Sequence, residues 1–184
     1  DSLALRIIPF WRLPLTADGL VMKFTNRLRG GILLNPNIIK RDRLLIAGTC
    51  GNGSKTWDVW NAFEELSAEK PLGNTLSGHG YEVRMYEGER CIVYAGNVVS
   101  DRKVDSAYTL LELPPCRYAS FEIYVSNGYE SENNAMDEWL ASNEEGYSEK
   151  LLNGKNYCVE YYDERFSGEE SGAIVEIWIP IEKG

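Results

Sequence analysis

The same order of strand and helix patterns occurs twice in this chain, and this repeat constrains the fold more than any other feature. The first copy begins with the apolar run 44–48. A helical pattern follows, with apolar residues at the spacing of one helix face: Trp57, Val59, Trp60, Phe63 and Leu66. Alternation over 81–86 and an apolar run over 91–99, separated by turn residues 87–89, then predict a hairpin.

The second copy begins after Pro114-Pro115. Residues 118–125 alternate as a strand, 157–162 alternate again, and 173–181 form the last strand pattern. A helical pattern lies between the first two of these strands, with three apolar residues on one face: Met136, Trp139 and Leu140.

Two copies of one unit predict a molecule with an approximate twofold axis and a seam between its halves. We expect an α+β fold: duplicated strand-helix-strand-strand units with an antiparallel sheet and a ligand cleft between the halves, because such seams often bind small molecules. The predicted halves are residues 44–113 and 114–182. The alternative is that the two halves are merely alternating patterns that resemble each other by chance.

Charge is distributed unevenly along the chain. Residues 1–43 contain eight Lys or Arg and three Asp or Glu, a net charge of +5, which leaves −14 for the rest of a chain whose total is −9. An acidic body is a poor nucleic-acid binder, because phosphate neutralisation supplies most non-specific affinity. The basic segment is either the remainder of a DNA-binding region or a solvated linker. Because the chain opens on Asp1, we expect it to be a fragment.

Few residues here suit metal or nucleophilic chemistry. His79 is the only histidine and lies among loop residues, which argues against histidine metal sites and histidine-dependent catalysis. No apolar run is long enough to span a membrane. We expect no cofactor, no metal and no membrane partner, and a cytoplasmic location in which the cysteines are free thiols. These are Cys50, Cys91, Cys116 and Cys158.

Successive side chains of a strand lie on opposite faces, and the last strand pattern separates them clearly. Its β-branched residues share one face, which we assign to the core under the helices, and Glu176 and Trp178 lie on the other. The same reasoning adds these residues to the second face: Tyr86, Tyr94, Tyr118, Glu122, Tyr124, Glu160 and Tyr162.

Aromatic side chains rarely stand in water in such numbers, so we predict that this second face lines a concave pocket. Carboxylates among aromatic rings favour a lipophilic cation, through ion pairing and cation–π contacts. A neutral aromatic ligand is an alternative, and a dimer interface or a second packing layer would have the same composition. Burial in such a pocket is expected to raise the pKa of Glu176.

Several stretches resemble the GyrI-like effector-binding domain found at the C-terminus of AraC-family and related regulators. They extend over about residues 44–182, and their order and spacing carry the resemblance. The matching stretches are 46–48, 56–63, 115–121, 138–140, 160–163 and, most clearly, Val175-Glu176-Ile177-Trp178-Ile179-Pro180-Ile181.

The resemblance implies a duplicated unit with a ligand cleft between its halves. In this family a glutamate of the last strand commonly lies at the pocket floor, and Glu176 has that position here. The resemblance also implies ligand contacts from Tyr162 and from the helix tryptophans Trp60 and Trp139, although helix tryptophans commonly belong to a core.

The resemblance further implies that residues 1–43 join a helix-turn-helix region, which this sequence lacks, to the effector-binding domain. Arg117 stands where the family often has glycine, and residues 122–124 replace a pattern that usually includes histidine or a smaller residue. The resemblance therefore does not indicate which ligand this chain binds.

Three functions follow as hypotheses. The first is a multidrug-sensing module of an AraC-type transcription regulator, which binds a small-molecule effector and contacts DNA only through the helix-turn-helix region. The second is a hydrolase of reactive small molecules, with Glu176 as general base. The third is a stand-alone interaction protein of the same fold, such as a topoisomerase modulator. A homodimer would be compatible with the first.

Overall fold

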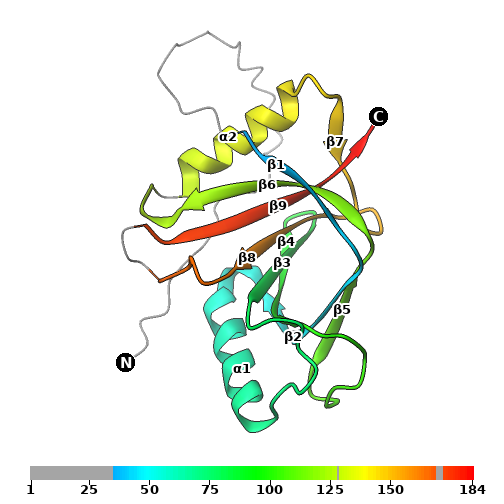
Figure 1. Cartoon of the computed structure of the whole chain (residues 1–184), viewed down its shortest axis with the longest axis vertical. Coiled ribbons are helices and arrows are strands. Elements are labelled where there is room, and N and C mark those ends of the chain that lie inside the picture. Colours follow the sequence, from blue (N-terminus) through cyan, green and yellow to red (C-terminus); the bar gives the residue numbers. More distant parts are fainter. Residues whose placement is uncertain (1–34, 128, 169–171) are drawn as a thin grey trace.

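The computed structural model describes residues 35–127, 129–168 and 172–184. Their strands form one antiparallel sheet that curls round on itself (Figure 1). The strands are β1 (Asn37–Arg41), β2 (Leu44–Asn52), β3 (Gly80–Glu87), β4 (Arg90–Val98), β5 (Thr109–Leu113), β6 (Cys116–Tyr124), β7 (Tyr147–Glu149), β8 (Asn156–Tyr162) and β9 (Ile174–Lys183). The helices are α1 (Thr56–Glu69) and α2 (Tyr129–Ser142). Within the described ranges, neither helix has the length and apolar character that a membrane crossing needs.

The strand order is symmetric about the middle of the sheet. The order β1-β6-β9-β8-β3-β4-β2-β5 maps onto itself when β1 is exchanged for β5, β6 for β2, β9 for β4 and β8 for β3. The seam between the halves therefore lies between β8 and β3, which pair along the whole of β8. Each half also places one helix between its second and third strands. The duplicated α+β fold predicted from the sequence is confirmed.

Each half contributes its first strand to the other half. β1 precedes β2 in the chain but pairs with β6, and β5 precedes β6 but pairs with β2. Only residues 42–43 separate β1 from β2, and only residues 114–115 separate β5 from β6. Each connection can span at most about 11 Å, so the two ends of the sheet are held close together and the sheet must curl.

The structure differs from the predicted boundary of the N-terminal arm. Residues 1–43 were expected to lie outside the domain, but Asn37–Arg41 forms β1 and is a full member of the sheet. A five-residue strand that pairs with a distant segment leaves no hairpin pattern in the sequence, and the same reason hides β5. Residues 1–34 lie outside the described ranges.

The two helices cover one side of the sheet, which we call the helix face. α1 packs on β2 and β4, and α2 contacts β6 and β7. Under α1 the buried core includes Leu45 and Phe63, and under α2 it includes Phe121 and Ile177. Phe121 and Ile177 are among the alternating strand residues that the sequence assigned to the core, and Phe63 lies on the predicted apolar face of the helix.

The opposite side of the sheet packs against itself. One cluster joins Ile46 of β2 and Leu113 of β5 to Tyr118 of β6, although these strands lie at opposite ends of the sheet. This side therefore lies inside the curl, and we call it the inner face. Val83 and Val159, on either side of the seam, are fully buried in the same cluster.

A buried ionic cluster crosses the seam on the helix face. Glu82 of β3 lies directly opposite Glu160 of β8, and Arg84 lies between them. Arg84 Nε donates to Glu160 Oε1 over 2.9 Å, and its Nη2 lies 2.5 Å from Glu82 Oε1 without the alignment of a hydrogen bond. Trp60 Nε1 donates to Glu82, and the Tyr162 hydroxyl donates to Glu160, each over 2.7 Å. Two carboxylates thus share one guanidinium.

Burial, and next the charge of Glu160, raise the pKa of Glu82 to about 7, although Arg84 and Trp60 act in the opposite direction. The folded protein therefore binds a proton at Glu82 more tightly than the unfolded chain does. The stability from this proton is fully present below the ordinary pKa of 4.5 and is lost as pH rises through about 7.

We expect Glu82→Gln to remove this pH dependence, because glutamine does not titrate. Between pH 5 and pH 8 the wild type should lose on the order of 2 kcal/mol of unfolding free energy that the variant keeps. Urea unfolding at both pH values measures the difference. Glu64→Gln, at an exposed position on α1, should retain the slope of the wild type. A Glu82→Gln protein with that same slope would contradict the prediction.

Candidate ligand-binding site

Four aromatic rings gather on the inner face where β9, β8, β3 and β6 meet. Trp178 of β9 stacks on Tyr161 of β8, with ring centroids 4.8 Å apart and planes inclined by 28°. Tyr118 of β6 and Tyr81 of β3 lie 5.8 and 6.0 Å from the Trp178 ring. We call these four residues the aromatic cluster. Trp178 is only 1% exposed, whereas Tyr161 is partly exposed, so Tyr161 is the member of the cluster that reaches solvent.

Glu176 lies on the same face as Trp178, two residues before it on β9. Its Oε2 accepts hydrogen bonds from Trp178 Nε1 over 2.7 Å and from Ser120 Oγ over 2.9 Å, and its Oε1 accepts one from Arg165. The side chain is 15% exposed. The structure therefore holds a largely buried carboxylate at the edge of the aromatic cluster.

Burial acts to raise the pKa of Glu176, but the hydrogen bonds from Trp178, Arg165 and Ser120 outweigh it and leave the pKa below its ordinary value. The expectation of a raised pKa is wrong. The cause is the set of donors around the carboxylate, Trp178 first and then Arg165, a loop residue that no strand pattern points to. Glu176 is ionised at neutral pH as a result.

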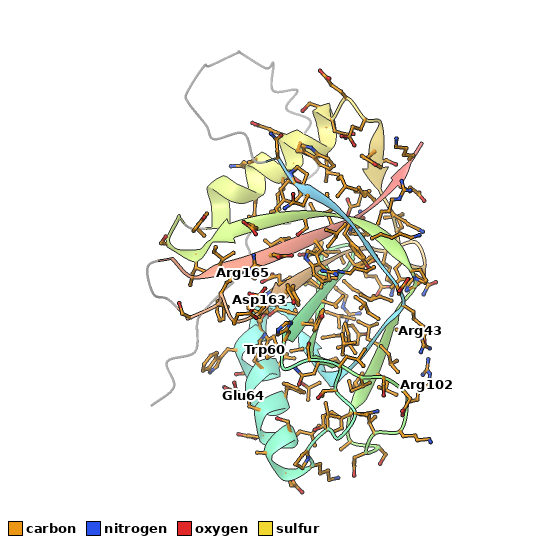
Figure 2. The ribbon with its side chains drawn as sticks, viewed as in Figure 1. Arg43, Trp60, Glu64, Arg102, Asp163 and Arg165 are labelled. Atoms are coloured by element: carbon orange, nitrogen blue, oxygen red, sulfur yellow. The ribbon has the colours of Figure 1, made fainter. Side chains whose placement is uncertain are left out.

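Arg165 also joins two further carboxylates to this site, and Figure 2 labels one of them, Asp163, beside it. Its guanidinium pairs with Asp163 and with Glu122, each over 2.7 Å. Glu122 of β6 faces Glu176 directly across the β6–β9 pair. The hydrogen bond from Arg165, opposed by burial, lowers the pKa of Asp163. Three carboxylates thus surround one cation, and an excess of negative charge remains.

Two more residues reach the aromatic cluster from outside the predicted site. The Tyr161 hydroxyl shares a hydrogen bond of 2.6 Å with His79 Nδ1, and His79 Nε2 lies 3.3 Å from Glu164. The guanidinium of Arg41 lies over the Trp178 ring, 4.7 Å from its centroid. Sequence patterns missed both residues: His79 lies in a loop, and Arg41 lies in the strand that the patterns did not reveal.

Part of the predicted set does lie together. Glu176, Trp178 and Tyr118 are neighbours on the inner face, and Tyr94 of β4 packs against the hydrophobic core of that face. The remaining members on β6 are exposed there: Glu122, which pairs with Arg165, and Tyr124, which is 46% exposed.

The other predicted residues lie on the helix face, so the assignment of faces in the two central strands is wrong. Tyr86 and Tyr162 pack with the core under α2, and Trp139 contacts Phe121 in that core. Trp60 packs edge-on against Tyr162, with ring centroids 5.7 Å apart. The ionic cluster explains the error, because it places Glu82, Arg84 and Glu160 on the buried helix face, where an alternating pattern predicts apolar residues.

The sequence itself has no counterpart among protein-family models, and no curated protein matches it. Solved structures do match. The C-terminal domain of EcmrR superposes with a TM-score of 0.60 at 17% identity, over 83% of this chain and 100% of that one. SAV2435 bound to tetraphenylphosphonium gives 0.57 at 13% identity, over 80% and 93% of the two chains. EcmrR in its DNA complex gives 0.62 at 16% identity, and this chain spans 59% of its length. These similarities identify the fold.

Proposed function

We propose that this chain, which has the fold of the GyrI-like effector-binding domains, is the small-molecule-binding module of a transcription regulator. The ligand is a lipophilic cation that binds against Tyr161 and Trp178 beside Glu176. The observation that carries the proposal is the largely buried, ionised Glu176 next to a stacked aromatic pair. Ring faces attract a cation by roughly 0.5–2 kcal/mol each, and a nearby carboxylate adds ion pairing.

The surrounding charge favours the same class of ligand. Arg165 is shared among Glu176, Glu122 and Asp163, so a ligand cation that takes over Glu176 leaves Arg165 with two partners. The related fold of SAV2435 is recorded with tetraphenylphosphonium, which is such a cation.

We propose a binding role for Glu176 in place of a catalytic one. A general base works best with a pKa near the operating pH, and three hydrogen-bond donors hold the pKa of Glu176 below its ordinary value. Such a carboxylate is a weak base but a persistent negative charge. The ligand is therefore released unchanged.

We further propose that the binding module regulates a tethered DNA-binding region, which the sequence resemblance favours as AraC-type. EcmrR, whose C-terminal domain shares this fold, is recorded in complex with DNA. The strongly acidic body of this chain suits a sensor better than a DNA reader.

Calorimetric titration with tetraphenylphosphonium, and with the neutral triphenylphosphine oxide, tests the proposal. We expect Glu176→Gln to weaken the affinity for the cation about tenfold or more and to leave the affinity for the neutral compound unchanged. Glu64→Gln, on the exposed side of α1, should bind both compounds as the wild type does. Equal cation affinity in wild type and Glu176→Gln would remove Glu176 from the site, and consumption of the compound would refute the non-catalytic role.

A further inference from the structure

Arg41 makes the same kind of contact with Trp178, a cation over the ring, that the proposed ligand would make. It is the last residue of β1, and its guanidinium lies 4.7 Å from the centroid of the Trp178 ring. Its charge also reaches the neighbouring rings: burial raises the pKa of Tyr81 and Tyr161, and the positive charge of Arg41 acts in the opposite direction on both. Arg41 is thus a cation placed among three members of the aromatic cluster.

In this position one hydrogen-bond donor of Arg41 is left without a partner. Its Nε is buried and has no hydrogen-bond partner among the described residues. A buried donor without a partner costs free energy of its own, so the position depends on the contact with Trp178. Arg43, two residues further, is in contrast half-exposed and pairs with Glu112 at the surface.

β1 is the element of the sheet that a change at Arg41 can move most easily. It has five residues, lies at one end of the sheet and pairs only with β6 among the described strands. Residues 1–36 precede it directly in the chain. A shift of β1 therefore reaches the segment through which a preceding DNA-binding region would be attached.

From these observations we infer that Arg41 is a built-in competitor for the cation site, and that a bound ligand cation displaces it and loosens β1. This inference rests on the proposed function and adds its regulation. A ligand changes a conformational equilibrium only if it binds one arrangement better than the other. Here the cation binds only the arrangement in which Arg41 has left Trp178, so its binding energy is coupled directly to the position of β1.

Arg41→Met tests the inference, because methionine keeps an apolar stem and removes the charge. We expect Arg41→Met to bind tetraphenylphosphonium about tenfold more tightly than the wild type, since the competing cation is gone. Arg43→Met is the matched control and should bind as the wild type does. In hydrogen-exchange measurements, tetraphenylphosphonium should speed exchange of the amides of residues 37–41 in the wild type and have little effect there in Arg41→Met.

The outcomes separate the two proposals. If the wild type binds tetraphenylphosphonium and Arg41→Met binds it equally or more weakly, the competitor role is overturned and the proposed function stands. If neither protein binds the cation, both proposals fail. Arg41→Lys keeps the charge with a weaker ring contact, so its affinity should lie between those of wild type and Arg41→Met. It decides the question if Arg41→Met does not fold, and wild-type affinity in Arg41→Lys would then overturn the inference.

Discussion

Arg84→Met is expected to lower the free energy of unfolding by about 3–5 kcal/mol at pH 7. Among the described residues Arg84 is the only cation in the ionic cluster, and its removal leaves Glu82 and Glu160 facing each other in the interior of the sheet. Methionine retains most of the volume of the arginine stem, so the loss reports the uncompensated carboxylates more than a cavity. Urea unfolding followed by tryptophan fluorescence measures it.

Arg102→Met provides the control for an arginine whose partner is at the surface. Arg102 pairs with Glu112, but its side chain is 62% exposed, so its replacement should cost about 0–1 kcal/mol. Adding Glu82→Gln and Glu160→Gln to Arg84→Met should restore most of the lost stability, because no buried charge then remains. A loss in Arg84→Met no larger than that in Arg102→Met would mean that the ionic cluster is not a set of buried charges.

Gly48→Ala should destabilise the protein by about 3 kcal/mol or more, the upper end of what overpacking costs. Gly48 of β2 and Gly96 of β4 are directly paired. A Cβ atom on Gly48 would lie 1.9 Å from the backbone oxygen of Ala95, and one on Gly96 would lie 2.2 Å from that of Ala47. Backbone atoms of a paired strand cannot rotate away, so β2 and β4 would have to separate.

Gly73→Ala is the matched control, since a Cβ atom there meets nothing within 4 Å. We expect it to be neutral or slightly stabilising. Thermal or urea unfolding of both variants provides the comparison. A cost below about 1 kcal/mol in Gly48→Ala would show that the two strands can move apart without loss of the fold.

The elements that sequence patterns predicted well are those whose pattern is local. The amphipathic face of α1 and the hairpin of β3 and β4 depend on neighbouring residues, and both occur as predicted. β1 and β5 depend on partners in the other half of the chain, and short strands of this kind leave no local signal. The fold class could therefore be predicted, and the edges of the sheet could not.

In the candidate site, too, some features could be predicted from the sequence and others could not. The faces of β9 could be predicted, because Val175, Ile177, Ile179 and Ile181 alternate and so place Glu176 and Trp178 together on the opposite face. The faces of β3 and β8 could not, because charged residues are buried on one side and tyrosines and valines fill the other. Arg165 reaches Glu176 from a loop, and no periodicity predicts a contact made by a loop.

The exchange of first strands makes each half depend on the other to complete its end of the sheet. A half separated from its sister would lose the strand that completes its own end, and β2 or β6 would be left with unpaired backbone groups that accept strands from other chains. A mutation that removed one copy would therefore damage both.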